Sequence, residues 1–273
     1  MSEVLKVSKS GYYNWLKKDK VKEAEKALFD EQIREVYEKS KHRYGSPRVY
    51  DAFQKLEIEG SQSKIARRMR EIGIAPVRKR KFRKTTDSKH DFKISPNILD
   101  RNFYAKMPGL AWVSDLTYIR IKNGFVYLTT VIDLADRKVV GWELSDNMTD
   151  LDTTISALKK ALKNRPVKPK LVFHSDRGSQ YASNDFRELI KDNKMIQSMS
   201  RKGNCWDNAV AESFFKTIKV ECLYNYKFET LSEVYSVVFD YIDGWYNTER
   251  IHSTLGGKSP NEMFDFLTSG EAA

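Results

Sequence analysis

The sequence is poor in cysteine, with two residues, Cys205 and Cys222, among 273. They form no Cys-x-x-Cys pair, and with the four histidines they give no zinc-site spacing. No apolar run approaches the roughly 20 residues that a membrane-spanning helix needs. The start, Met1 to Val4, lacks the basic and apolar blocks of a secretory signal. We therefore expect reduced thiols, no structural zinc, no membrane segment and a cytoplasmic location.

Acidic residues are fewer than basic ones, 37 against 48, which gives a formal net charge of +11. The hydrophobic content of 40% and the charged content of 31% are ordinary for a globular protein. The length allows a moderate core with a smaller module attached, so we expect two domains. A strongly basic chain without a membrane segment indicates a polyanionic partner, with nucleic acid as the leading candidate.

Two carboxylates occupy positions where their surroundings are informative. Asp176 follows the short apolar run 171–174, which is typical of a buried strand, so Asp176 lies where that strand ends. Asp115 interrupts 112–119, a stretch rich in β-branched and aromatic residues. An unpaired carboxylate in mid-strand would cost several kcal/mol, on the order of a whole fold's stability margin. Asp115 therefore needs a cation.

A third carboxylate, Glu212, lies in a predicted helix whose inward face is marked by Ala211, Phe215 and Ile218. Three acids from two strands and a helix can converge on a hard divalent ion such as Mg²⁺. Two such ions form the clamp used in phosphodiester chemistry. Each acid taken alone is also compatible with a solvated surface position.

The segments 112–115, 174–181 and 198–215 resemble the insertion-sequence transposases of the IS-three family and, more distantly, the catalytic core of retroviral integrases. The 35 residues between Asp176 and Glu212 match the separation in that family. The resemblance continues into a similar carboxy-terminal signature, which comprises Asn247, Arg250, His252, Leu255, Ser259 and Pro260.

This resemblance implies an α/β fold: a ribonuclease H-like, integrase-type catalytic core with an amino-terminal all-helical helix-turn-helix-like module. It implies that Asp115, Asp176 and Glu212 are catalytic and hold Mg²⁺, with Mn²⁺ as a substitute, as two ions. The implied reaction is cleavage and strand transfer of double-stranded DNA at insertion-sequence ends in a bacterial nucleoid. Implied partners are further copies of the chain and the product of an upstream reading frame. The absent zinc module is a departure from retroviral integrases.

Two other functions are compatible with the residues. A nuclease acting on RNA–DNA hybrids would share the core fold, and a DNA-binding regulator derived from a transposase would keep the fold without activity. The basic amino-terminal helices and the acid on a late helix favour the transposase over the nuclease. The three intact acids argue against the regulator.

The amino-terminal region, 1–75, predicts three helices. In 23–39 the expected inward residues are Ala24, Leu28, Val36 and Tyr37, with Ala27 and Ile33 beside them. Ser46 is expected to cap a second helix with Pro47 at its first position, and Ser61 and Gly73 to bound a third.

In the third helix Ile65, Met69 and Ile72 are expected to point inward. This leaves a basic outer face of Lys64, Arg67, Arg68 and Arg70 for DNA. Both a helix-turn-helix and a small bundle with a solvated basic face fit this pattern.

Residues 76–107 are expected to connect the two domains. Their basic run, 78–84, is expected to follow DNA phosphates, although a targeting or solubilising role also fits.

The second domain, 108–268, is expected to begin with three antiparallel strands and a hairpin at Asn123-Gly124. A helix over 150–163, the strand before Asp176, a helix over 184–192, a strand over 195–199 and the helix of Glu212 follow. This β-β-β-α-β-α-β-α order is the ribonuclease H-like arrangement. A last helix, 231–246, should pack on the domain, and only the resemblance places the loop 247–260 near the site.

Four residues near the acids permit two interpretations. Asp207 has a structural explanation, with Asn208, as a helix N-cap. His174 either assists a proton transfer or is fixed at the strand end by hydrogen bonds. Lys216 and Lys219 follow Glu212 on one helix face, where they either position DNA or neutralise the acids.

Overall fold

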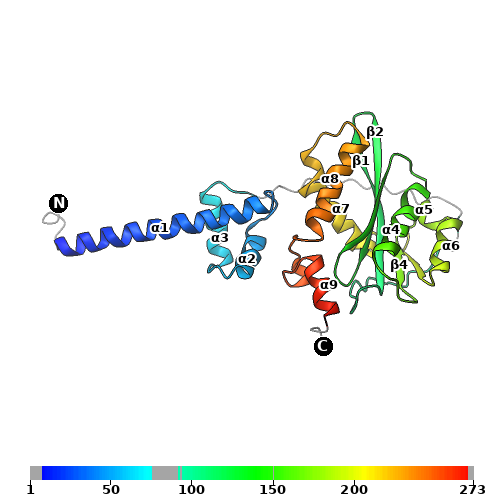
Figure 1. Ribbon diagram of the computed structural model, residues 1–273, viewed down its shortest axis with the longest axis horizontal. Coiled ribbons are helices and arrows are strands. Elements are labelled where there is room, and N and C mark those ends of the chain that lie inside the picture. The colour runs from blue at the N-terminus through cyan, green and yellow to red at the C-terminus, as the bar shows by residue number, and fades with distance from the viewer. Residues whose placement is uncertain (1–7, 76–91, 93, 150, 270–273) are drawn as a thin grey trace. The chain divides into compact units, whose positions relative to one another are not determined.

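The computed structural model describes residues 8–75, 92, 94–149 and 151–269. The chain forms two compact units, Met1–Val77 and Arg78–Ala273 (Figure 1). The basic run 78–84, with its expected phosphate contacts, lies outside the described residues. Within those ranges, no helix has the length and apolarity that crossing a membrane requires.

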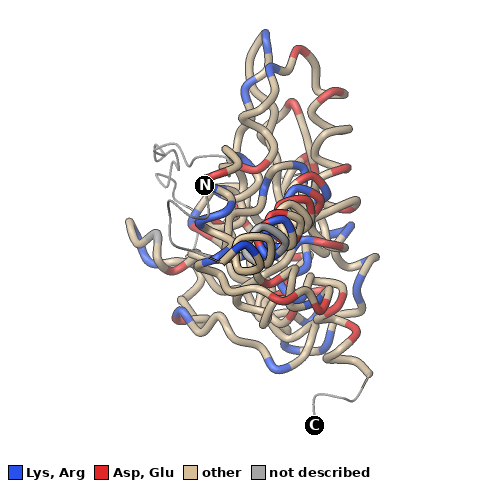
Figure 2. The backbone as a smooth tube through the Cα atoms, turned by 90° about the vertical axis from the view of Figure 1, so that its left-hand side faces the viewer, with Lys and Arg blue, Asp and Glu red and all other residues tan. Residues whose placement is uncertain are grey.

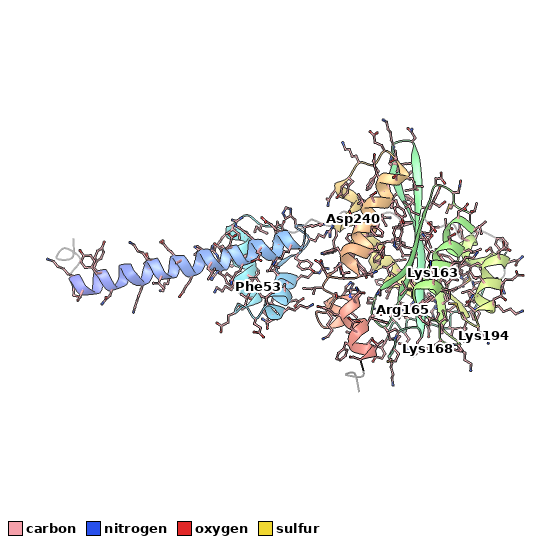
Figure 3. The ribbon with its side chains drawn as sticks, in the orientation of Figure 1. Phe53, Lys163, Arg165, Lys168, Lys194 and Asp240 are labelled. Carbon is pink, nitrogen blue, oxygen red and sulfur yellow. The ribbon has the colours of Figure 1, made fainter. Side chains whose placement is uncertain are left out.

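The first unit consists of α1 (Lys9–Lys39), α2 (Ser46–Lys55) and α3 (Gln62–Glu71). Its core surrounds Phe53 (Figure 3), whose ring meets that of Phe29 edge to face with 5.5 Å between centroids. Ser61 caps α3 by accepting a hydrogen bond from Lys64 N, and Gly73 follows the helix with a φ of +74°. Both predicted ends of α3 are thereby confirmed.

The inward face of α1 differs from the prediction. Leu28 is 63% exposed, and Ala24 and Ala27 are also exposed, while Phe29 and Ile33 are buried. The burial starts at Phe29 because α2 and α3 cover only the last third of this long helix. The predicted cap of α2 is also wrong, since Gly45 occupies the N-cap position and Ser46 is already helical.

The second unit is built on a five-stranded sheet in the order β3-β2-β1-β4-β5. The first three strands pair antiparallel, and β4 and β5 continue from β1 in parallel. Their bounds are β1 Ala111–Ile121, β2 Gly124–Asp133, β3 Val139–Ser145, β4 Val172–Ser175 and β5 Ile196–Met199. The strand order along the chain, with the helices between, confirms the predicted ribonuclease H-like arrangement.

Helices cover both faces of this sheet. Figure 1 shows α4, α5 and α6 on one side and α7 and α8 on the other. The first three span Ser156–Asn164, Ser179–Ala182 and Asn184–Asp192, and a π-helical turn, Leu151–Ile155, precedes α4. The other two span Ala209–Glu221 and Leu231–Tyr241. Side chains alternate along β1, so Trp112 belongs to the core under α4 to α6, and Asp115 faces the α7 side.

The predicted hairpin between β1 and β2 is present with its turn one residue earlier than expected. Ile121 pairs with Gly124, so Lys122 and Asn123 form the two-residue loop. Gly124 has a φ of +138°, which a residue with a side chain rarely adopts.

A buried carboxylate stabilises the end of the sheet where β1 begins. One oxygen of Asp133 accepts hydrogen bonds from Gly109 N, Trp112 Nε1 and Arg165 Nη1, and the other accepts one from Ala135 N. Arg165 (Figure 3) also forms an ion pair with Asp136 at 2.8 Å. Asp133 is fully buried, yet the described residues give it four donors, so it is a structural acid.

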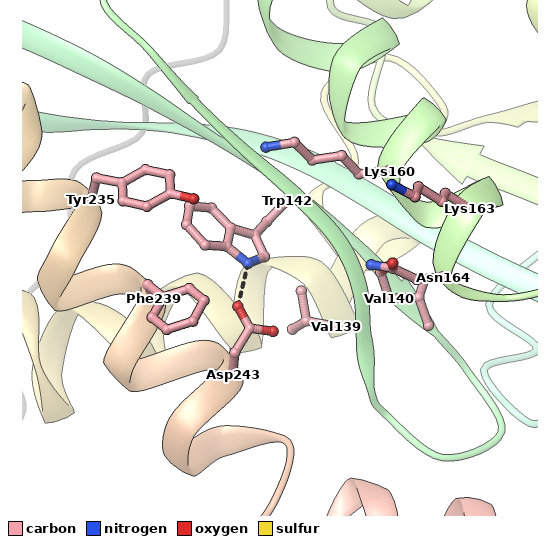
Figure 4. Close-up of a pocket in the computed structure, with 9 residues that line it drawn as sticks. All are labelled: Val139, Val140, Trp142, Lys160, Lys163, Asn164, Tyr235, Phe239 and Asp243. Carbon is pink, nitrogen blue, oxygen red and sulfur yellow. Dashed lines mark hydrogen bonds between the residues drawn. The ribbon is translucent and has the colours of Figure 1, made fainter.

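The carboxy-terminal segment packs beside β3. Trp142 of β3 donates its indole N–H to Asp243 at 2.9 Å and lies against the ring of Tyr235, at the rim of a shallow pocket (Figure 4). The predicted helix over 231–246 is α8 followed by a π-helical turn, Ile242–Tyr246. The last helix, α9 (Pro260–Thr268), starts at a capping box formed by Ser259 and Glu262.

Gly141 of β3 gives a test of this packing. A Cβ there would lie 2.5 Å from the carbonyl oxygen of Ala157 and 2.6 Å from the nitrogen of Ala161, both backbone atoms of α4. Because neither can move aside, Gly141→Ala should lower the free energy of unfolding by about 3 kcal/mol, the upper part of the range for overpacking. Urea unfolding followed by tryptophan fluorescence measures it. Gly244→Ala, with nothing within 4 Å, is the control and should be nearly neutral; equal effects would contradict the packing argument.

Candidate active site

Strand pairing brings Asp115 and Asp176 together. In the parallel register of β1 and β4, Val113 lies opposite His174. Asp115 lies two residues farther along β1, and Asp176 lies two residues beyond His174, directly after β4 ends, so the parallel register brings both acids to the same level of the sheet. Asp176 accepts a hydrogen bond from Gly178 N at 2.9 Å, which fixes the carboxylate at the turn after β4.

Helix α7 brings Glu212 to the same place. Ala211, Phe215 and Ile218 are buried, as predicted. Two hydrogen bonds attach the helix to β1 on either side of Asp115: Asn208 Nδ2 donates to the Ser114 carbonyl at 3.0 Å, and Lys219 Nζ donates to Thr117 Oγ1 at 2.6 Å. Glu212, in the first turn, is exposed to solvent.

The pKa of Asp115 responds to both of the other acids. Burial raises the pKa of Asp115 well above its usual value, and the charges of Asp176 and, to a lesser degree, Glu212 raise it further. The Leu116 N–H, which donates to Asp115 at 2.8 Å, and the ammonium of Lys219 oppose this. Burial and the two neighbouring acids thus disfavour the charged form of Asp115.

A divalent cation fits this donor set. In the described ranges, no three His, Cys, Asp or Glu side chains are drawn together closely enough to hold a metal ion. Carboxylate oxygens are the ligands that Mg²⁺ prefers, and the exposed position of Glu212 leaves one side open to water and substrate.

The two lysines that follow Glu212 have different surroundings. Lys216 is exposed. Lys219 is only 8% exposed, and its ammonium is bonded to Thr117, two residues beyond Asp115. Burial lowers the pKa of Lys219, and the charge of Asp115 partly restores it. We interpret Lys219 as a group that balances the acids, so the expected DNA contact is retained for Lys216 alone.

His174 is completely buried directly before the acidic turn. Its Nδ1 is 2.8 Å from Ser198 Oγ and its Nε2 is 3.1 Å from Ser200 Oγ, so both ring nitrogens are engaged. Burial lowers its pKa to about 4. Of the two interpretations of His174, this geometry favours a neutral ring that joins β4 to β5.

The predicted capping role of Asp207 is wrong: Asn208 occupies the N-cap position of α7, and no side chain makes a capping hydrogen bond there. Asp207 is fully buried, and Arg201 binds it through Nε and Nη2 at 2.8 and 2.9 Å. Arg101 Nε and Asn97 Nδ2 donate to it from the opposite direction at 2.8 and 3.1 Å. No local pattern in the sequence indicates partners about a hundred residues away.

The segment that holds Asp207 belongs to the second unit. Ile98 N and Leu99 N donate to Ser198 Oγ of β5, and Ser95 Oγ donates to Gln197. Residues 94–103 are thus part of the core's edge, although the sequence predicts a connector over 76–107.

In the first unit, three of the four residues of the predicted basic face are exposed and Arg68 is not. Lys64, Arg67 and Arg70 are exposed, but Arg68 is 6% exposed and forms ion pairs with Asp30 of α1 and with Glu71. The prediction that Arg68 points outward is wrong because Asp30, which is distant in sequence, attracts it to the α1–α3 interface.

Comparison with known proteins agrees with this architecture. Two families that are both described as "Integrase core domain" match residues 105–205 and residues 212–263. A third family, described as "HTH-like domain", matches residues 23–82. The chain is 36% identical to "Transposase InsF for insertion sequence IS3A" of Escherichia coli strain K12 over 96% of this chain and 92% of that protein. It is 37% identical to "Insertion element IS600 uncharacterized 31 kDa protein" of Shigella sonnei over 95% and 96%.

Among solved structures, the chain is similar to a simian T-cell lymphotropic virus intasome in complex with PP2A regulatory subunit B56 gamma. The TM-score is 0.50 at 14% identity, over 85% of this chain and 74% of that one. This likeness shows the integrase-type fold.

The buried His174 predicts a pH dependence. Its folded pKa, about 4, lies below the ordinary value of 6.5, so the unfolded chain binds the extra proton first. Stability should therefore be full above pH 6.5 and fall as the pH decreases from 6.5 toward 4. His174→Asn should cost stability at pH 7 and make the loss between pH 6.5 and 4 shallower, by up to about 3 kcal/mol. Urea unfolding across this range measures it, and an unchanged acid dependence would contradict the buried neutral ring.

Proposed function

This chain belongs to the insertion-sequence transposases of the IS3 type, and from that membership we propose that it cuts DNA at the ends of an insertion sequence and joins them to target DNA. The observation that supports the proposal is that Asp176 and Glu212 both act on the charge of the buried Asp115, while Glu212 itself is exposed to solvent. The reaction is hydrolysis of a phosphodiester at the element's end, followed by attack of the freed 3′ hydroxyl on another strand.

We propose that the three acids hold Mg²⁺, with Mn²⁺ as a substitute, as a pair of ions. The chemistry that such ions supply is activation of the attacking oxygen and stabilisation of charge on the leaving oxygen. Asp115 and Asp176 enter from the rigid sheet, and Glu212 enters from α7, whose position is set by Asn208 and Lys219. Lys219 keeps part of the acidic charge balanced.

The first unit supplies a DNA-binding surface in this proposal. Its α2–α3 pair has the helix-turn-helix order, and α3 carries exposed Lys64, Arg67 and Arg70. Figure 2 shows Lys and Arg residues distributed over the backbone of the chain, in keeping with its charge of +11. Lys216 extends phosphate binding to the catalytic face. Joining two ends requires both in one complex, so we propose at least a dimer on DNA.

The acids give the first test. Asp115→Asn, Asp176→Asn and Glu212→Gln keep the side-chain shape and remove a ligand charge. Each should abolish cleavage and strand transfer of a labelled element end while DNA binding stays within about twofold, since the phosphate contacts lie elsewhere.

Gel shifts and cleavage in Mg²⁺ or Mn²⁺ on the same preparations measure both properties. Full activity in any variant would remove that residue from the catalytic set. Cleavage without strand transfer by the unmodified chain would favour the nuclease, and binding without either reaction would favour the regulator.

The basic face of α3 gives the second test. Replacing Lys64, Arg67 and Arg70 together by Gln should reduce the slope of log affinity against log salt by roughly two to three units, because each phosphate contact contributes about 0.9. The matched control removes three exposed lysines of the second unit, Lys163, Lys168 and Lys194 (Figure 3), and should leave the slope nearly unchanged.

Arg68→Gln completes this series. It should lower the thermal stability of the first unit, because Asp30 then loses its buried partner. If the slope of log affinity against log salt is the same in the α3 variant and in the lysine control, Lys64, Arg67 and Arg70 do not contact DNA phosphates.

A further inference from the structure

The turn that leads into α7 holds one residue out toward solvent. The 3₁₀ turn Cys205–Asn208 directly precedes the helix of Glu212. In it Asp207 and Asn208 are buried, whereas the indole of Trp206 is 70% exposed. An exposed tryptophan that protrudes from a fixed turn is unusual, since this side chain gains most from burial.

The neighbours of Trp206 fix its position. Asp207 is bound by Arg101 and Arg201 and receives a further hydrogen bond from Arg201 N at 2.9 Å. Asn208 is bonded to the carbonyl of Ser114, the residue before Asp115. Both anchors pull inward, so the turn cannot rotate to bury the indole without breaking them. These anchors thus fix the turn that carries the exposed ring, and Asn208 attaches that turn to β1.

Cationic side chains are found at the anchor of this turn and in the segments before and after it. Arg101 and Arg201 each keep nearly half of their side-chain surface exposed, 46% and 49%, although both bind Asp207. Lys202, which precedes the turn, and Lys216, on the following helix, are exposed. An exposed aromatic ring combined with exposed cations is what binds unpaired nucleobases, with the ring against the base and the cations against the phosphates.

We propose that Trp206 is a stacking platform for an unpaired base at the DNA end that is being cut. This inference rests on the proposed function, because the base that stacks on Trp206 is the one next to the phosphodiester that the proposed reaction cleaves. Within a duplex both faces of a base are covered by its neighbours, so the indole needs a terminal base that has left its pair. Opening a terminal pair costs a few kcal/mol, and stacking on an aromatic ring returns a comparable amount.

The experiment combines a protein change with a DNA change. The full chain and its Trp206→Ala variant are compared in cleavage of a duplex that carries the end of the encoding element. A parallel series of duplexes lacks one base at each terminal position in turn. On intact DNA the variant should cleave roughly 5- to 150-fold more slowly, the rate change that corresponds to the loss of one stacked base. On the duplex that lacks the stacked base the same substitution should change the rate less than about twofold.

Two variants serve as controls. Trp206→Phe keeps an aromatic face and should retain most of the rate. Tyr224→Ala removes an exposed ring, 49% accessible, just beyond the other end of α7 and should have no effect on any duplex. A Trp206→Ala penalty that is the same on every duplex would overturn the proposal, and it would place Trp206 in contact with protein, such as a second copy of the chain.

A second readout separates this proposal from the proposed function. In the cleavage-deficient Asp176→Asn chain, binding to DNA with 2-aminopurine at the terminal position should change its fluorescence, and adding Trp206→Ala should remove that change. If the unmodified chain binds and cleaves DNA but the fluorescence does not depend on Trp206, the stacking role alone fails. If the unmodified chain binds DNA without cleaving it and the fluorescence does depend on Trp206, the catalytic proposal alone fails.

Discussion

The repulsion between two carboxylates on adjacent parallel strands is the constraint on which the site depends. Backbone pairing of β1 and β4 sets Asp115 and Asp176 side by side, and the charge of Glu212 adds to their field. The strands cannot separate to relieve the repulsion without breaking the parallel pairing of Ala111–Val113 with Val172–His174. The unfavourable charge must therefore be offset by neighbouring cations, such as Lys219, and by the divalent ions of the proposed reaction.

The rest of the second unit makes this concentration of charge tolerable. At the start of β1, Asp133 has four donors and Arg165 as its ion partner, so this acid adds no uncompensated charge. On the face of the sheet away from Asp115, the backbone of α4 lies directly against Gly141, and Trp112 and Phe173 fill the core. Asp115 itself gains little stability from its position on the other face, because its surroundings disfavour its charge, whereas the buried apolar residues of α7 around it do stabilise the fold.

Much of this arrangement could be predicted from the sequence, because it follows from local periodicity. Alternation placed the strands, helical spacing placed Ala211, Phe215 and Ile218 inward, and a mid-strand acid marked Asp115. The errors arose where a distant partner decides the outcome. The helical pattern places Arg68 on the surface, because the sequence does not show that Asp30, 38 residues away, binds it. Asp207 is predicted as an N-cap because the sequence does not show that Arg101, in the expected connector, binds it. Leu28 is predicted to face inward because the sequence does not show that Phe29 packs against Phe53 of α2. Pairings of this kind have no signature within a window of the chain.

The burial of Asp207 also links two parts of the chain that the sequence separates. Asn97 and Arg101 precede the first strand, yet they hold the residue that fixes the turn before Glu212. Arg201 contributes from the other side, so the turn is held by the edge of the core as well as by its own loop. The position of the third acid therefore depends on contacts made by residues before the sheet begins. A substitution that displaces residues 94–103 would therefore move Asp207 and, with it, Glu212. The positions of Asp115 and Asp176 would not change.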